Sequence, residues 1–109
     1  MFKLNPKPTF TAPVALSVPG LSEPLEVLFT FRHKGKEALA KWVATASQKL
    51  DAEALSEVVC GWAGVKDEDG QDVPYTLTAL SALLENYPAS QGEVFRAYLR
   101  ELTEAKRKN

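Results

Sequence analysis

The stretch FTAPVALSVPGLSEPLEVLFTFR, residues 10–32, decides the fold because its apolar residues alternate with mostly small or polar ones in two blocks. The alternating apolar positions are Phe10, Ala12, Val14, Leu16 and Val18 in the first block and Leu25, Val27, Phe29 and Phe31 in the second. A period of two residues predicts an antiparallel strand pair with one buried face, joined by the Pro- and Gly-rich residues 19–24. Because Pro13 has no amide hydrogen, we expect the first strand to lie at a sheet edge there.

After residue 35 the apolar residues recur every three or four positions, which predicts amphipathic helices. The first predicted helix buries Leu39, Trp42, Val43, Ala46 and Leu50. The second, over residues 52–62, is expected to begin after the capping residue Asp51 and to end at Gly61 and Gly64. Its predicted inward residues are Leu55, Val58, Val59 and Trp62.

Two further helices are predicted in the last third of the chain. The third follows the capping residue Thr76, stops before Pro88, and buries Leu77, Leu80, Leu83, Leu84 and Tyr87. The fourth begins with a capping box of Ser90 and Glu93, buries Val94, Phe95, Tyr98, Leu99 and Leu102, and carries Lys106, Arg107 and Lys108 near its end. The predicted fold is α+β, an N-terminal antiparallel β-strand pair followed by a bundle of about four α-helices, as a single domain over residues 1–109.

The composition narrows the class of protein. A chain of 109 residues with 45% hydrophobic and 25% charged residues is expected to form a packed core. Its net charge of −1 lacks the basic excess typical of nucleic-acid-binding proteins. No signal peptide or membrane-spanning run is seen, and the single cysteine, Cys60, fits a reducing compartment. We expect a soluble cytosolic protein that binds neither nucleic acid nor membrane.

An acidic stretch, GWAGVKDEDGQDVPYT at residues 61–76, suggests a calcium loop, a catalytic carboxylate cluster or a turn. An EF-hand loop needs oxygen ligands at positions 1, 3, 5 and 12 and glycine at position 6. With Gly70 at position 6, Asp67 and Asp69 fit, but Val65 falls at position 1 and Thr76 at position 12. Since Asp-Gly is a strong turn dipeptide, the sequence favours a tight turn in a short hairpin.

Residues that carry catalytic chemistry are sparse. His33, the only histidine, borders a Lys-Gly turn without a nucleophile or orienting residue nearby in the sequence, and is expected at the surface. Cys60 is expected to be a small core residue. Phosphate-binding loops, nucleophile elbows and Cys/His clusters are missing from the sequence. We therefore expect no enzymatic activity, no cofactor and no metal.

The C-terminal half, roughly residues 58–109, resembles the tail assembly chaperones of long-tailed bacteriophages. The resemblance lies in GWAGVKDEDGQDVPYT, the leucine-rich LTALSALLENYP and the closing VFRAYLRELTEAKRKN. In that family a Trp-x-Gly-Val segment leads into an acidic turn and then a Pro-aromatic-Ser/Thr helix start. The matching positions here are Trp62, Gly64, Val65, Asp67, Gly70, Pro74, Tyr75 and Thr76. One departure is Leu77-Thr78, where family members often carry Pro-Glu.

The resemblance implies a non-enzymatic chaperone of a phage or prophage, acting in the bacterial host cytoplasm. Such proteins bind the tape-measure protein and the tail-tube protein during tail morphogenesis and are absent from the mature virion. Many are made in two forms, the longer by a programmed frameshift, and Lys108-Asn109 is compatible with a slippery A-AAA-AAC run. Self-association is also expected.

The strand pair suggests how such partners would be bound. A two-stranded ribbon is only marginally stable alone, so its apolar face must cover the helices or a partner, and its edges offer backbone groups that another chain can extend. We predict that residues 9–18 or 25–32, with the apolar stripe of the last helix, contact partners or sibling subunits. The predicted contact residues are Phe10, Val14, Leu16, Val27, Phe29, Phe31, Phe95, Tyr98 and Leu102.

Two alternatives remain. The first is a minor structural tail or neck protein that is retained in the particle. The second is a small nucleic-acid-binding regulator whose first two helices form a helix-turn-helix. The near-neutral charge argues against the regulator, and so does its recognition helix, residues 52–62, which has Glu53 and Glu57 but no Lys or Arg.

Overall fold

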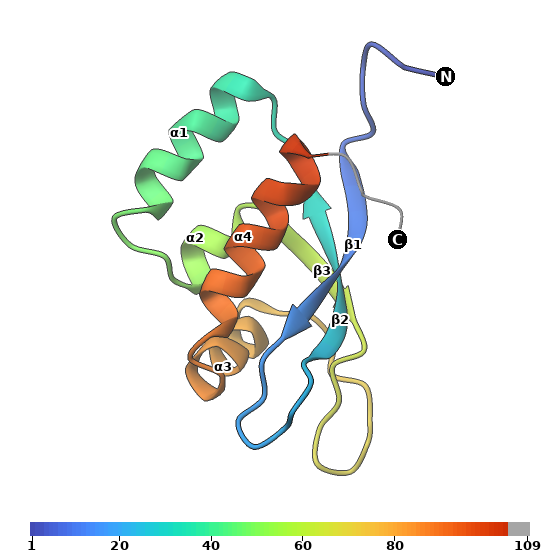
Figure 1. The fold of residues 1–109 in the computed structure, drawn as a ribbon, viewed down its shortest axis with the longest axis vertical. Coiled ribbons are helices and arrows are strands. Elements are labelled where there is room, and N and C mark those ends of the chain that lie inside the picture. Colours follow the sequence, from blue (N-terminus) through green and yellow to red (C-terminus); the bar gives the residue numbers. More distant parts are fainter. Residues whose placement is uncertain (105–109) are drawn as a thin grey trace.

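A computed structural model describes residues 1–104, and three β-strands and four α-helices lie within them (Figure 1). In chain order the elements are β1 (Thr9–Leu16), β2 (Leu25–Arg32), α1 (Lys36–Ala46), α2 (Ala52–Ser56), β3 (Val59–Ala63), α3 (Leu77–Asn86) and α4 (Ser90–Thr103). The strands form one sheet in the order β1-β2-β3, and both neighbouring pairs are antiparallel. This confirms the predicted α+β class and the N-terminal strand pair, and it adds a third strand in the middle of the chain.

The register of β1 against β2 explains why a proline is tolerated in the first strand. Pro13 pairs with Leu28, and beyond the strand the amide of His33 donates to the carbonyl of Pro8 at 2.8 Å. In an antiparallel pair, hydrogen-bonded positions recur at every second residue, so the even-numbered residues of β1 bond to β2. The backbone groups of its odd-numbered residues point away from β2, toward the free edge. Pro13 therefore removes a donor from the free edge and not from the ladder, which confirms the predicted edge position.

The main difference from the predicted fold lies in residues 52–62, which do not form one continuous helix. The helix α2 ends at Ser56, and the chain then pairs with β2 as the strand Val59–Ala63. A helix-turn-helix regulator would need its recognition helix in this segment, so that alternative loses the element on which it depends.

Local preference and pairing both favour the strand β3. Val58, Val59 and Trp62 have the spacing of a helical stripe, but β-branched valines and Gly61 favour an extended chain over a helix. Trp62 also pairs across the strands with Phe29, and their rings meet edge to face at 6.2 Å. The pairing satisfies the second edge of β2, which a helix in this position would leave open.

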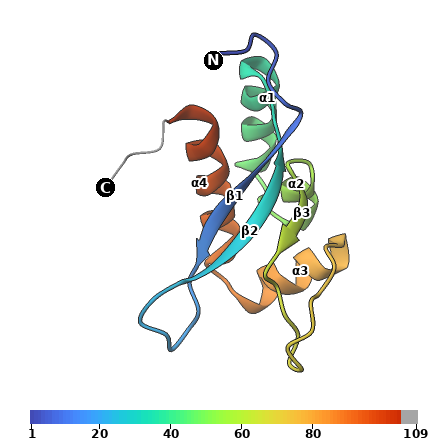
Figure 2. The ribbon, with the colours of Figure 1, turned by 90° about the vertical axis from the view of Figure 1, so that its right-hand side faces the viewer.

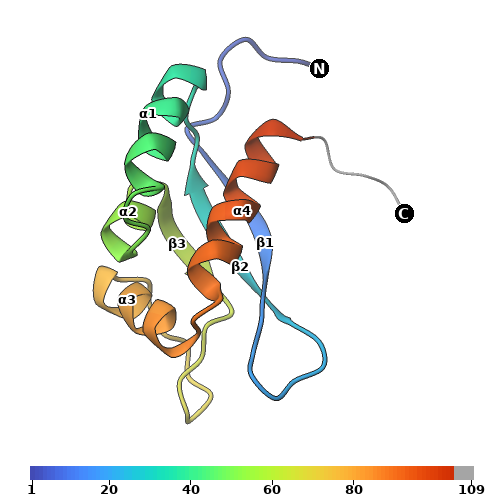
Figure 3. The ribbon, with the colours of Figure 1, turned by 60° about the vertical axis from the view of Figure 1, so that its left-hand side comes forward.

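All four helices lie on one face of the sheet, in front of it in Figure 3, while Figure 2 looks onto the other face. The core between these layers confirms the predicted inward face of both strands. The buried apolar residues are Ala12, Val14, Leu16, Val27, Phe29, Phe31, Trp42, Ala46, Ala54, Leu55, Val58, Val59, Leu80, Leu83, Val94, Ala97 and Tyr98. Leu50 lies beyond the end of α1 at Ala46, so its predicted place in that helix is wrong.

Tyr98 fastens α4 to the sheet. Its side chain is fully buried, and its hydroxyl donates a hydrogen bond to the carbonyl of Arg32 at 2.8 Å. The ring centroid lies 5.1 Å from that of Phe31 and 5.4 Å from that of Trp42. Burial raises the pKa of Tyr98 to about 12, because the charged phenolate is poorly solvated there.

Two predicted helix caps are confirmed. The side chain of Asp51 accepts a hydrogen bond from the amide of Ala54 at 2.9 Å, and this bond lowers the pKa of Asp51. The hydroxyl of Thr76 accepts from the amide of Ala79 at 3.0 Å and so begins α3. Both caps satisfy amides that the first turn of a helix leaves without a partner.

The predicted capping box of Ser90 and Glu93 is wrong because both side chains have other partners. Ser90 is buried, and its hydroxyl donates to the carbonyl of Tyr87 at 2.6 Å. The Glu93 carboxylate turns to the end of β1, where it accepts from the amide of Ser17 at 3.0 Å. The cations predicted at the end of this helix, at positions 106–108, lie outside the described residues.

Candidate functional site

The nine predicted contact residues lie on β1, β2 and α4, and all belong to one hydrophobic core or pack against it. Six are buried: Val14, Leu16, Val27, Phe29, Phe31 and Tyr98. Three are partly buried against the same core: Phe10, Phe95 and Leu102. In this fold their packing holds α4 on the sheet. Their contact with a partner stays a prediction.

The sheet offers a partner fewer free backbone groups than a two-stranded ribbon would. Because β3 pairs with residues 28–31 of β2, this part of the strand lies in the middle of the sheet and its backbone groups are not free for another chain. Contact between a partner and residues 9–18 or 25–32 stays a prediction. The strand β1 keeps a free edge, on which Pro13 offers no donor. At one end of this edge the amide of Ser17 already donates to the carboxylate of Glu93.

The outer side of β3 is covered by the chain that returns from the following turn. The indole nitrogen of Trp62 donates to the carbonyl of Val73 at 2.8 Å, and the hydroxyl of Tyr75 donates to the carbonyl of Val59 at 2.9 Å. The rings of Trp62 and Tyr75 meet edge to face at 5.1 Å. Burial raises the pKa of Tyr75. Trp62 and Tyr75 therefore fix the returning chain against β3.

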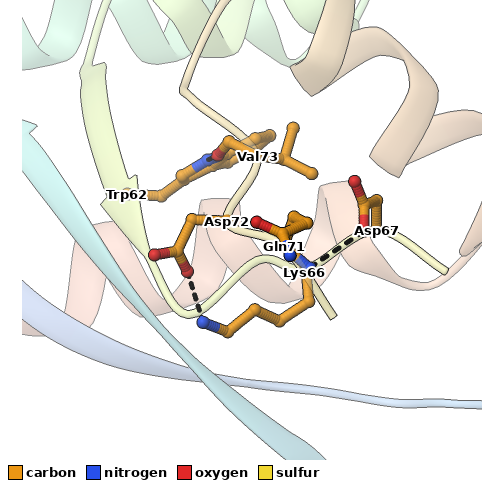
Figure 4. A network of polar contacts seen from close by, with 6 residues as sticks. All are labelled: Trp62, Lys66, Asp67, Gln71, Asp72 and Val73. Atoms are coloured by element: carbon orange, nitrogen blue, oxygen red, sulfur yellow. Dashed lines mark hydrogen bonds and ion pairs between the residues drawn. The ribbon is translucent and has the colours of Figure 1, made fainter. Parts of the chain in front are cut away.

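Residues 65–73 form a tight hairpin, called here the acidic hairpin, whose flanking valines are joined by a backbone hydrogen bond of 2.9 Å. One carboxylate oxygen of Asp67 accepts from the amides of Asp69 and Gln71, each at 2.9 Å. Figure 4 shows the bond from Gln71. Gly70 has a φ of +78°, a conformation that favours glycine. These contacts confirm the predicted turn.

The acidic hairpin carries four carboxylates and one lysine. Lys66 forms an ion pair with Asp72, which Figure 4 shows across the base of the hairpin. Within residues 1–104, Glu68 and Asp69 have no ion-pair partner. The described part of the chain has no group of three or more His, Cys, Asp or Glu side chains placed to share a metal ion. The hairpin therefore presents a negative surface.

An apolar groove lies beside the acidic hairpin, between the end of the strand pair and α3. Its volume is about 280 Å³, and its apolar lining is Leu16, Val18, Leu25, Val27, Val65, Leu83 and Tyr87. Glu26 and Lys66 also line it. A second hollow of about 510 Å³ shares Val65, Lys66, Leu83 and Tyr87 with the groove and reaches Asp67 and Glu68. The apolar surface thus continues to the acidic residues of the hairpin.

Sequence patterns assign most groove residues to the core and so miss this surface. Leu25 belongs to the inward set of its strand, but it lies at the strand's first position, where 55% of its surface is exposed. Leu21, in the loop before it, is 54% exposed. A strand that extends beyond the covering helices leaves its last inward residues open, and only the tertiary packing shows where the cover ends.

The predicted position is confirmed for His33 but only in part for Cys60. His33 is exposed, as predicted. Cys60 is only partly buried, and its thiol lies 3.6 Å from the carbonyl of Thr30.

Across residues 1–104, no helix combines the length and the apolar character needed to cross a membrane.

Comparison with known proteins identifies the family to which the chain belongs. A family model described as phage tail assembly chaperone matches residues 1–109. No curated protein and no solved structure matches the chain. The match covers the N-terminal sheet and the helices as well as the C-terminal half that carries the sequence motifs.

Proposed function

The chain belongs to the phage tail assembly chaperone family, whose members are not enzymes, and from this membership we propose that it binds the tape-measure and tail-tube proteins. It would keep both proteins soluble during tail morphogenesis and be absent from the mature virion. The observation that carries this proposal is the family match over all 109 residues. We propose further that residues 1–109 act as one domain in the host cytoplasm.

The surfaces described above give this role a physical basis. A chaperone that holds other proteins in soluble form must offer them apolar surface while remaining soluble itself. The apolar groove, with Leu25 more than half exposed and a negative hairpin beside it, meets both conditions. Among the nine predicted contact residues, Phe10, Phe95 and Leu102 are partly exposed, and we propose these as direct contacts. The six buried ones would act by holding α4 on the sheet.

Co-expression tests the proposed partners. The tape-measure protein and the tail-tube protein are each produced in bacteria with and without this chain, and the soluble fraction of each is measured. A capsid protein from the same phage is the control for a general effect on solubility. Both tail proteins should gain soluble yield and co-purify with the chain. Unchanged solubility of both would contradict the proposal.

Mass spectrometry of purified virions tests the absence from the particle. The proposal expects peptides of the tube protein but none of this chain. Recovery in fixed stoichiometry would support a minor structural tail or neck protein instead. A longer frameshifted product stays a prediction, and sequencing the gene for a slippery heptamer at the codons of Lys108 and Asn109, which lie outside the described residues, tests it.

A further inference from the structure

The first eight residues, called here the N-terminal arm, leave their large apolar side chains outside the core. Phe2 is 96% exposed and Leu4 is 90% exposed. Pro6 and Pro8 favour extended conformations in the residues before them, so the arm does not continue as a helix that could fold these side chains inward. Large apolar residues that stay in water are typical of a segment that binds another surface.

The arm is also basic. Lys3 and Lys7 alternate with the apolar residues, and the arm has no acidic residue. Neither lysine has an ion-pair partner within residues 1–104. The arm therefore combines two exposed apolar side chains with two unpaired positive charges in eight residues.

The apolar groove has the complementary composition. Its lining is mainly aliphatic, and Glu68, which lines the adjoining hollow, and its neighbour Asp69 in the acidic hairpin have no ion-pair partner within the described residues. A surface that joins an apolar lining to unpaired carboxylates fits a segment with apolar and basic side chains. Among residues 1–104, the N-terminal arm is a segment that has both properties and lies outside the core.

The arm and the groove lie at opposite ends of the molecule. In Figures 1 and 2 the N-terminus extends beyond one end of the sheet, while the loop between β1 and β2 and the acidic hairpin project from the other end. The arm of one copy therefore points away from its own groove, and a second copy can bring a groove to it. Such a contact joins two different surfaces, so it can extend through several copies or close a ring.

We propose that the N-terminal arm of one copy binds in the apolar groove of a second copy. Phe2 and Leu4 would enter the groove, and Lys3 and Lys7 would lie against the carboxylates of Glu68 and Asp69 in the adjoining acidic hairpin. The proposal does not depend on the identity of the tail partners, because it is tested on the pure protein. Failure of either proposal leaves the other open to its own experiment.

Analytical ultracentrifugation of the chain with a C-terminal tag tests this contact. The average mass should rise with concentration between about 5 µM and about 500 µM, a range in which small interfaces dissociate. The double variant Phe2→Ser, Leu4→Ser should weaken the association at least about tenfold, as loss of apolar anchors does at other interfaces. Both residues lie outside the core, so the circular dichroism spectrum should not change.

A charge exchange tests the pairing itself. The arm variant Lys3→Glu, Lys7→Glu and the hairpin variant Glu68→Lys, Asp69→Lys should each stay monomeric when alone. Mixed in equal amounts they should associate again, because the acidic arm of the first then meets the basic hairpin beside the groove of the second. Higher salt should weaken the wild-type association.

The matched control is Leu28→Ser, which changes an exposed leucine on the uncovered face of the sheet. It should associate like the wild type. A wild-type chain that stays monomeric at all concentrations would overturn the proposal. So would a double arm variant that associates normally, a failed charge exchange, or a loss of association in the Leu28 variant equal to that of the arm variant.

Discussion

Glu93, in the first turn of α4, accepts two hydrogen bonds from the amide of Ser17, at 3.0 and 3.2 Å, across 76 positions of the chain. The hydroxyl of Ser17 also donates to this carboxylate. The contact fixes the start of the last helix to the end of the first strand. It also occupies a backbone donor on the free edge of β1, where Pro13 already lacks one.

Glu93→Ala is expected to lower the free energy of unfolding by about 1 kcal/mol, because it removes a charged acceptor from an amide and a hydroxyl. Urea denaturation followed by tryptophan fluorescence measures the change. The control is Glu85→Ala, an exposed glutamate on α3, which should change stability by less than about 0.5 kcal/mol. Equal effects of the two variants would show that the contact with Ser17 contributes nothing.

Phe29→Ala and Leu28→Ala test the assignment of the two sheet faces with neighbouring residues. Phe29 is fully buried, so its truncation should cost about 3–5 kcal/mol. Leu28 is 49% exposed on the uncovered face, and its truncation should cost less than about 1 kcal/mol. Thermal unfolding followed by circular dichroism compares them. Similar losses of stability would contradict the observed register.

Tyr98→Phe should reduce the loss of stability at alkaline pH. The pKa of Tyr98 is raised from its ordinary value of 10.0 to about 12 by burial, so the unfolded chain loses this proton at lower pH than the folded protein. The stabilisation is therefore complete below pH 10 and is lost as the pH rises from 10 to 12. Over this interval the variant's free energy of unfolding should fall less steeply than that of the wild type.

The control for this experiment is Tyr87→Phe, whose hydroxyl makes no hydrogen bond within residues 1–104. At neutral pH this variant should change stability by less than about 0.5 kcal/mol. At neutral pH the Tyr98 variant should also lose about 1 kcal/mol, since the carbonyl of Arg32 loses its hydroxyl donor. An unchanged alkaline slope in the Tyr98 variant would contradict its burial.

Asp67→Ala should destabilise the acidic hairpin, and Asp69→Ala should not. The Asp67 carboxylate accepts from two amides, so its loss is expected to cost about 1 kcal/mol, whereas Asp69 contributes only its backbone amide. Hydrogen exchange at the amides of residues 69–71 measures the difference. Neither variant should respond to calcium, because Val65 and Thr76 occupy two ligand positions of an EF-hand loop. Calcium binding with micromolar affinity would overturn this expectation.

The sequence alone predicts those elements in which the spacing of apolar residues and the local hydrogen bonds favour the same secondary structure. The strands β1 and β2 have a clear period of two, and Asp51 and Thr76 cap helices through amides three positions along the chain. The strand β3 was missed because Val58, Val59 and Trp62 fit a helical stripe equally well. The choice between helix and strand depends on pairing with β2, which otherwise has an open edge. This is a tertiary contact, and the local sequence pattern does not contain it.

The candidate site was harder to predict for the same reason. The inward residues of the strands were identified correctly, but the end of the sheet that the helices leave uncovered depends on how they pack. Leu16 and Leu25 pair directly across the two strands, yet the first is buried and the second is more than half exposed. The prediction of a capping box is wrong because the amide of Ser90 donates to the carbonyl of Tyr87, while Glu93 accepts from Ser17, which is distant in the sequence.

Because α4 packs over β1 and β2, the fold is completed only after α4 has been synthesised. On the ribosome, β1 and β2 are made long before Glu93 and Tyr98, which reach back 76 and 66 positions to bind them. A nascent chain that stops before residue 90 exposes Phe29, Phe31 and their neighbours to water. Interrupted translation products are therefore expected to be substrates for bacterial proteases, so that complete chains accumulate selectively.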